Sequence, residues 1–181
     1  MKTAAFFFLA ALAALAGSAA AANEFEWGGS FMLSGDGSFT WIAQKTGSGD
    51  NMAYADPTMK LAVLPAMDGS EEALEALGEE GNHALEEECT DVLPGGVIPV
   101  EMDACVRIVF DQNATETHFT ISAPSEQFVA IFAEHFPTEF ENDRHYLADP
   151  SGVDVEPLMS LNDGGHDDHD DDHEDEPRRM L

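Results

Sequence analysis

The sequence predicts an α+β fold: a single domain with a mostly antiparallel sheet and two short helical segments, followed by a disordered acidic His-rich tail. Several segments alternate apolar and polar residues with the period of two that β-strands show. Two other stretches, 70–88 and 126–135, have apolar patterns that favour helices. From Asn162 onward the composition narrows to Gly, His, Asp and Glu, which cannot bury enough surface to fold. The order β-β-β-α-β-β-β-α is typical of α+β proteins.

The first half of the chain contains three predicted strands. Apolar residues share one parity over 25–33 and again over 39–43, and the glycines in 35–37 between them predict a hairpin. A third alternating segment covers 59–63 and is expected to end at Pro65, because proline cannot donate to a strand ladder.

The pattern changes period at Ser70, which is a plausible helix N-cap with acidic residues in the following turn. The apolar stripe over 70–88 indicates a helix, and Gly78 and Gly81 weaken its middle, which leaves one helix or two short ones as the alternatives. Strands are then expected over 97–100, 106–110 and 117–122.

A second helix is expected over 126–135, capped by Ser125 and ended by Pro137. Its residues are apolar on most sides, so we expect it to be buried against the sheet. Residues 139–157 are mixed in character and predict an ordered loop with a short element. The periodic apolar segments all end before Asn162, which places the domain at 23–161 and the tail at 162–181.

The N-terminus has the features of a secretory signal peptide. Lys2 is the only charged residue among the first 23, and an apolar run of about a dozen residues and a string of alanines follow. The apolar run is too short to cross a bilayer, which needs roughly 20 residues. We therefore expect residues 1–22 to be removed and the mature chain to be extracellular or periplasmic, with no direct membrane insertion. A retained N-terminal anchor is the alternative.

The chain is strongly acidic, with 36 Asp and Glu against seven Lys and Arg and a formal net charge of −29. Such a field repels nucleic acid, so no nucleic-acid partner is expected, and it attracts cations. It also keeps a protein soluble at high salt, where screening relieves the self-repulsion. Adaptation to a saline habitat is therefore a second explanation of the acidity.

Two cysteines, Cys89 and Cys105, are expected to form a disulfide in an oxidising compartment. Two thiolate metal ligands are the alternative, although neither cysteine belongs to a Cys-x-x-Cys pair. Asn113 begins a glycosylation sequon, whose use the sequence leaves open.

The tail carries the strongest chemical pattern in the sequence. Three histidines are three and four residues apart, with carboxylates in every gap. Neutral imidazole is a ligand for zinc and related metals, and carboxylates complete the coordination. If metal binding folded the segment into a helix, the three histidines would share one face. The predicted metal ligands here are His166, His169, His173, Asp167 and Asp170; an acidic solvating tail is the alternative.

This tail resembles the His- and acid-rich segments of extracytoplasmic zinc-acquisition binding proteins and zinc transporters. The resemblance covers residues 166–176 and is one of composition. It implies zinc or another divalent metal as the ligand and a membrane metal transporter as a partner. The body is too short for the two lobes of a solute-binding protein, whose tight metal site lies in the body, and it is not assigned to a family.

The body contains a second group of candidate ligands between residues 134 and 156. His135 and His145 are ten residues apart, with Glu139 between them, and such a set could make a shell for zinc. His118 could join from the outer face of its strand. The alternative roles are structural: His135 at a helix C-terminus, where its charge meets the helix dipole, and His145 as a surface residue.

The sequence thus favours a secreted or periplasmic divalent-metal binding protein, acting as buffer, scavenger or metallochaperone, and not an enzyme. It contains no Gly-x-Ser-x-Gly, His-Glu-x-x-His, Walker or dinucleotide motif. The main alternative is a secreted acidic structural or interaction protein that serves salt tolerance, calcium or a matrix partner. A small secreted hydrolase is a third possibility.

Overall fold

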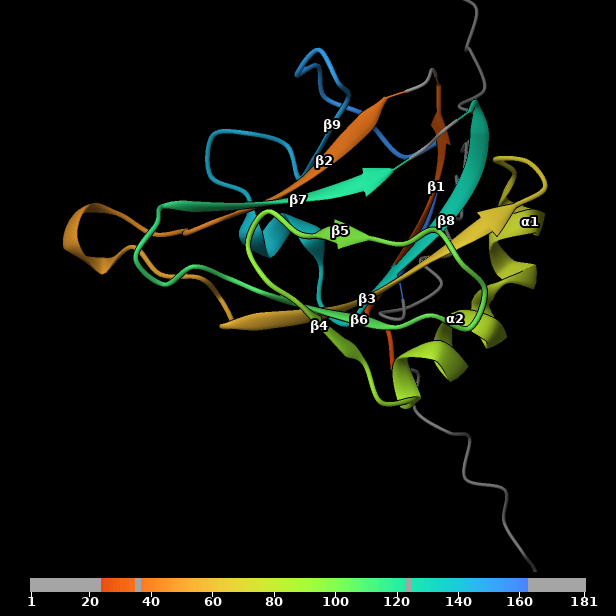
Figure 1. Ribbon diagram of the computed structural model, residues 1–181, viewed down its shortest axis with the longest axis horizontal. Helices are drawn as coiled ribbons and strands as arrows, with labels where there is room; N and C mark the ends of the chain where they lie inside the picture. The colour runs from red at the N-terminus through yellow and green to blue at the C-terminus, as the bar shows by residue number, and fades with distance from the viewer. Residues whose placement is uncertain (1–23, 35–36, 123–124, 163–181) are drawn as a thin grey trace, which may run out of the picture.

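The computed structural model describes residues 24–34, 37–122 and 125–162, and they form one mixed α+β domain (Figure 1). The predicted signal peptide and all of the predicted tail except Asn162 lie outside these residues. In chain order the elements are β1 (Trp27–Leu33), β2 (Ser38–Gln44), η1 (Gly49–Asn51), β3 (Thr58–Ala66), α1 (Glu71–Ala76), α2 (Gly78–Glu86), β4 (Thr90–Val92), β5 (Val97–Ile98), β6 (Val106–Val109), β7 (Glu116–Ser122), β8 (Gln127–Ala133), η2 (Pro137–Phe140), β9 (Leu147–Ala148) and β10 (Met159–Asn162).

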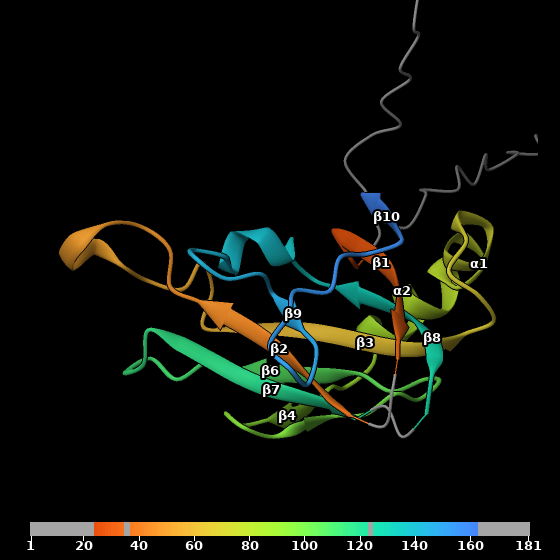
Figure 2. The ribbon, with the colours of Figure 1, turned by 90° about the horizontal axis from the view of Figure 1, so that it is seen from above.

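The strands form two sheets, a six-stranded one in the order β10-β1-β8-β3-β6-β4 and a four-stranded one in the order β5-β7-β2-β9. The pairs are antiparallel except β4 with β6 and β5 with β7. The α+β class and the mostly antiparallel pairing are confirmed, and the strands divide between two sheets that share one core (Figure 2).

The expected hairpin between the first two strands is wrong. β1 pairs with β8 and β10, whereas β2 pairs with β7 and β9 in the other sheet. Both strands carry large aromatic side chains, Trp27 and Phe31 on β1 and Phe39 and Trp41 on β2, and all four are buried in the core between the sheets. Placing the strands in facing sheets buries both aromatic faces against each other.

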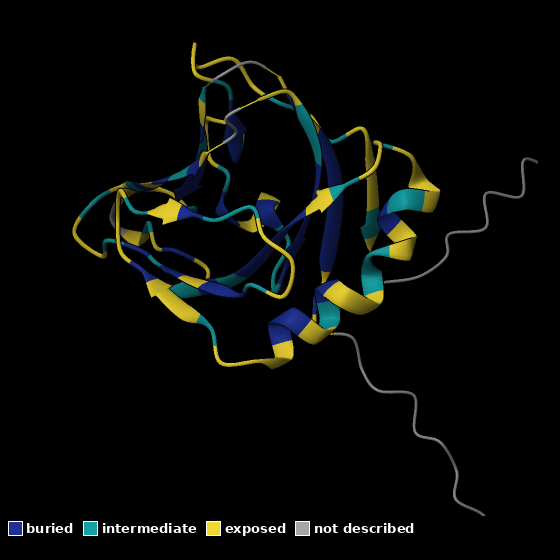
Figure 3. Ribbon diagram, turned by 45° about the vertical axis from the view of Figure 1, so that its right-hand side comes forward, coloured by how far each residue is buried: buried dark blue, intermediate teal, exposed yellow. Residues whose placement is uncertain are grey.

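The helices cover the outer face of the six-stranded sheet. Ser70 caps α1 by accepting a hydrogen bond from the Ala73 N–H at 3.2 Å, as its position predicts. Leu74, Ala84 and Leu85 pack with Phe132 in a second core, and the outer sides of both helices are exposed (Figure 3). The helix predicted over 70–88 is confirmed, and it is one bent helical segment that comprises α1 and α2. In the described part of the chain, no helix has the length and apolar character to cross a membrane.

The helix expected over 126–135 is wrong, because this segment is the strand β8. β8 lies in the middle of its sheet between β1 and β3, and both of its faces are covered. Val129 and Ile131 face the core between the sheets, and Ala130 and Phe132 face the helices. A strand buried on both faces has a continuous apolar run, which periodicity cannot distinguish from a buried helix.

The strand β3 passes through Pro65 and does not end there. Pro65 pairs with Val129 of β8, but β6 pairs with β3 only from Thr58 to Leu61. Beyond Leu61, the side of β3 that faces β6 has no partner strand. Pro65 has no N–H to donate, but at this position no ladder hydrogen bond is lost.

The disulfide between Cys89 and Cys105 is confirmed. The cysteines are 16 residues apart in sequence and their Cα atoms are 4.6 Å apart. Cys89 follows α2 and Cys105 precedes β6, and the Thr90 N–H donates to the Cys105 carbonyl at 3.1 Å. The bond therefore fixes the helices to the edge of the six-stranded sheet, at the start of β4.

Candidate functional site

The loop after η2 carries His145, and a buried glutamine of β2 fixes its backbone. Gln44 Oε1 accepts hydrogen bonds from the N–H groups of Asn142, Asp143 and Arg144 at 2.9, 3.2 and 3.1 Å. The Gln44 amide also donates to Asp143 Oδ1 at 2.5 Å. Because Gln44 is 5% exposed and lies at the end of a central strand, the loop is held against a rigid element.

His145 faces an oxygen acceptor at each ring nitrogen. Its Nδ1 lies 2.7 Å from Glu141 Oε1, and its Nε2 lies 3.1 Å from the Val155 carbonyl and 3.9 Å from Glu156 Oε2. Glu141 Oε1 also accepts the Tyr146 N–H at 2.8 Å, and the two rings pack with centroids 4.0 Å apart. A metal ion bound at either nitrogen would have to displace one of these contacts.

His135 lies two residues after the end of β8, between two exposed carboxylates. Its Nδ1 is 3.7 Å from Glu26 Oε2 and its Nε2 is 3.5 Å from Asp56 Oδ2. Because β8 is a strand, the alternative role of His135 at a helix C-terminus does not apply. Each carboxylate lies near a different ring nitrogen, so the two do not converge with one nitrogen on a common point.

The three predicted body ligands do not form a metal-binding group in the structure. Glu139 lies in η2 and is exposed, while the contacts of His135 and His145 are made with other carboxylates. Within residues 24–34, 37–122 and 125–162, no group of three or more His, Cys, Asp or Glu side chains is arranged to hold a metal ion. His118, on the outer face of β7, contacts Glu116 Oε1 at 3.0 Å.

The predicted tail ligands lie outside the described residues. These are His166, His169, His173, Asp167 and Asp170. The described chain ends in β10, an edge strand whose Asn162 pairs with Trp27 of β1. The part of the chain that the structure describes therefore ends at the edge of the six-stranded sheet.

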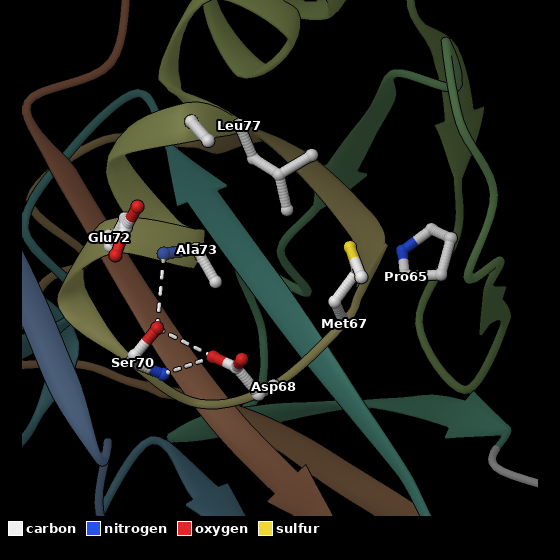
Figure 4. A pocket seen from close by; sticks show the side chains of 8 residues that line it. Pro65, Met67, Asp68, Ser70, Glu72, Ala73 and Leu77 are labelled. Carbon is white, nitrogen blue, oxygen red and sulfur yellow. Dashed lines mark hydrogen bonds between the residues drawn. The ribbon is translucent and has the colours of Figure 1, made fainter.

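A cavity of about 400 Å³ lies between the end of β3 and α1, and sequence reasoning did not identify it. Its apolar lining is formed by Pro65, Met67, Ala73, Ala76 and Leu77, and its polar lining by Asp68, Ser70 and Glu72. The side chains of Met67, Ala73 and Leu77 project into the space between the strand and the helix (Figure 4).

The turn that connects β3 to α1 at this cavity is closed by hydrogen bonds between Asp68 and Ser70. Asp68 Oδ1 accepts from the Ser70 N–H at 2.9 Å and from its hydroxyl at 2.6 Å. These bonds, the hydroxyl first, hold the pKa of the Asp68 carboxyl below its usual value. The carboxylate therefore stays ionised beside the apolar lining.

One sequence feature pointed toward this cavity, namely the N-cap at Ser70. The cap predicts where α1 begins, but the cavity also needs the end of β3 to lie beside the helix, which pairing with β8 determines. Comparisons of the chain with protein-family models, with characterised proteins and with solved structures gave no significant match.

Proposed function

We propose that this chain is an acidic extracytoplasmic protein that binds divalent metal ions, zinc by preference, and acts as a buffer, scavenger or metallochaperone rather than as an enzyme. The observation that carries the proposal is the sequence of the tail, where His166, His169 and His173 alternate with carboxylates. Imidazole nitrogen is a zinc ligand that a purely solvating acidic tail would not need.

The disulfide supports the extracytoplasmic part of the proposal. Disulfides form and persist in secreted and periplasmic proteins, whereas cytosolic thiols are kept reduced. The bond between Cys89 and Cys105 joins two segments of the fold, so an oxidising compartment is the one in which the fold is complete. The predicted signal peptide at residues 1–22 points to the same compartment.

In this proposal the tail binds the metal ions, and the body is the folded domain that carries the tail. The body histidines already have partners: His135 lies between Glu26 and Asp56, and His145 contacts Glu141 and the Val155 carbonyl. The tail adds nine carboxylates around three histidines, and this density of charge attracts hydrated cations before an imidazole binds them. Delivery to a membrane metal transporter would suit a tail of this composition.

Calorimetric titration of the mature, disulfide-bonded protein with zinc tests the proposal. Replacing His166, His169 and His173 together by Asn keeps the length and the carboxylates of the tail but removes its nitrogen ligands. We expect this variant to lose zinc affinity by tenfold or more at about pH 7.5. The matched control, His135→Asn with His145→Asn, should retain the wild-type affinity. Equal affinity of the tail variant and the wild type would rule the tail out as the metal site.

The pH dependence gives a second readout. A ligating imidazole must be neutral, and its unperturbed pKa is about 6.5, so protons compete with zinc as the pH falls through about 6. Carboxylates have pKa values near about 4 and would hold a metal ion to about pH 5. We therefore expect zinc to be released at about pH 6. Release only below about pH 5 would show that carboxylates bind the zinc.

A second function, that of a secreted acidic interaction protein, is favoured by the distribution of charge in the body. Residues 61–106 contain 12 Asp and Glu and no Lys or Arg. Such a surface would keep the protein soluble at high salt, and its carboxylates could bind calcium, which prefers oxygen ligands. Titration with calcium separates the two functions: stronger binding of calcium than of zinc, unaffected by the triple His→Asn replacement, would favour this second function.

A further inference from the structure

The cavity beside α1 belongs to a larger apolar surface that nothing in the described structure covers. Met67 on its lining is 95% exposed, an unusual fraction for a large apolar side chain. Leu158, which is 49% exposed, lies against Gly69, two residues after Met67 in the chain. Neighbouring exposed apolar side chains beside a cavity are typical of an interaction site.

The charge around this surface has a single sign. Asp68 and Glu72 line the cavity itself, and Glu71 and Glu75 are exposed on the same helix. Over the whole segment 61–106 no Lys or Arg offsets the 12 acidic residues. The basic side chains that the structure describes are engaged elsewhere. Lys45, Lys60, Arg107 and Arg144 contact the Gln112 carbonyl, the Leu85 carbonyl, Asp91 and Glu116, respectively.

We propose that the cavity between the end of β3 and α1 is a docking site for a partner protein, through a segment in which an apolar side chain is flanked by Lys or Arg. The apolar side chain would enter between Met67, Ala73 and Leu77. The basic neighbours would then lie beside Glu72 and the ionised Asp68. A cavity of about 400 Å³ is large enough for one or two aliphatic side chains.

The charge complementarity decides the chemistry of the partner. An acidic or neutral segment would gain the apolar contact but would meet the uncompensated field of the helices. A hydrophilic basic segment would be attracted by that field but would leave the apolar lining exposed. Only a segment that is both basic and apolar would fill the apolar lining and also neutralise the acidic side chains around it.

The test uses the mature, disulfide-bonded protein in metal-free buffer, so that its outcome does not depend on zinc binding. The probe is a fluorescein-labelled peptide in which two leucines are flanked on each side by two arginines. The matched peptide has serines in place of the leucines and the same charge. We expect the leucine peptide to bind about tenfold more tightly by fluorescence anisotropy, because one buried leucine contributes at least that factor.

Two pairs of protein variants locate the binding. Ala76→Trp fills the cavity from the exposed face of α1 and should weaken binding about tenfold, whereas Ala55→Trp, on an exposed loop, should have no effect. Glu72→Gln should weaken binding about threefold, and more than Glu80→Gln, which makes the same change of charge on α2. Circular dichroism shows whether each variant is folded.

Four outcomes would overturn the proposal. Equal affinity for the two peptides would reduce the interaction to general charge attraction. Unchanged binding by Ala76→Trp would place it elsewhere on the protein. Peptide binding that appears only after residues 163–181 are deleted would mean that a segment of the chain itself occupies the site. Self-association that Ala76→Trp abolishes would assign the cavity to a second copy.

Discussion

At position 81 a glycine lies where a side chain would meet the ring of Phe132. A Cβ built on Gly81 would come within 2.5–2.9 Å of three atoms of that ring. Phe132 is fully buried between α2 and the six-stranded sheet, so it has little room to move. The absence of a side chain at Gly81 therefore lets the helix approach the sheet closely.

We expect Gly81→Ala to lower the free energy of unfolding by about 1–3 kcal/mol, because crowding in a packed core exceeds the gain in helix propensity. The matched control is Gly78→Ala in the same helix, where a new Cβ would meet nothing within 4 Å. This control should leave stability unchanged or raise it by up to about 1 kcal/mol. Denaturant unfolding measures both, and an equally stable Gly81→Ala variant would contradict the close packing.

The two tyrosines of the chain predict a loss of stability in alkali. Burial raises the pKa of Tyr146, and the charges of Glu141 and Glu156 raise it further. The pKa of Tyr54 is also raised, again chiefly by burial. The fold therefore favours the neutral phenol, whereas the unfolded chain ionises near pH 10. The stabilising contribution is complete below about pH 10 and is lost as the pH rises above it.

For Tyr146 we expect the free energy of unfolding to fall by about 1 kcal/mol per pH unit above about pH 10. Tyr146→Phe keeps the ring and removes the ionising group, so its stability should fall less steeply over pH 10–11. Denaturant unfolding at several pH values compares the slopes. Parallel curves for Tyr146→Phe and the wild type would show that Tyr146 ionises as readily in the fold as outside it.

Among the elements, the strand β7 shows why a strand with one buried and one open face is predicted well from the sequence. β7 alternates between buried and more exposed residues along its length, with Thr117, Phe119 and Ile121 buried. β8 has no such alternation because both of its faces are covered. The short strands β4, β9 and β10 have two to four residues each, too few for any period to be detected.

The connection from α2 to β4 depends on the disulfide, which closes a loop of 16 residues. In the chain-entropy model a loop of this size contributes about 3 kcal/mol. We expect a reducing agent to lower the free energy of unfolding by about that amount, and hydrogen exchange to accelerate at the Thr90 amide. A variant with both Cys89 and Cys105 replaced by Ala should not respond to the reductant. A wild-type midpoint that is the same with and without reductant would contradict this expectation.

At the scale of the whole molecule, the candidate sites differ in how far the sequence reveals them. The tail motif is local, so its composition can be read directly. The neighbours of His145 depend on Gln44, about a hundred residues earlier, and on the pairing of β2 within its sheet. The cavity depends on Met67 and Leu77 facing each other across a turn. Side chains brought together by long-range pairing leave no periodic pattern in the sequence.

The edge strand β10 fixes where the chain can be shortened. It pairs with β1 from Trp27 to Ser30, and Leu161 packs against the second core. Deleting residues 163–181 should therefore leave the melting temperature in metal-free buffer unchanged. Deleting 158–181 removes the strand as well and should cost about 2 kcal/mol or more. Thermal unfolding compares the two, and a large loss in the shorter deletion would mean that the tail contributes to the fold.

The pairing of the first strand also controls when the protein can fold. β1 has no neighbour close in sequence, because its partners are β8, which ends at Ala133, and β10. At a synthesis rate of about 5–20 residues per second, β8 is completed on the order of 5–20 s after β1. During this time the aromatic side chains of β1 have no partner strand to pack with. Until then, closing the intervening loop has an entropic cost that no contact offsets. We therefore expect folding to be completed only after β8 and β10 have been synthesised, so that most of the chain is still unfolded, and in a state suited to export, until then.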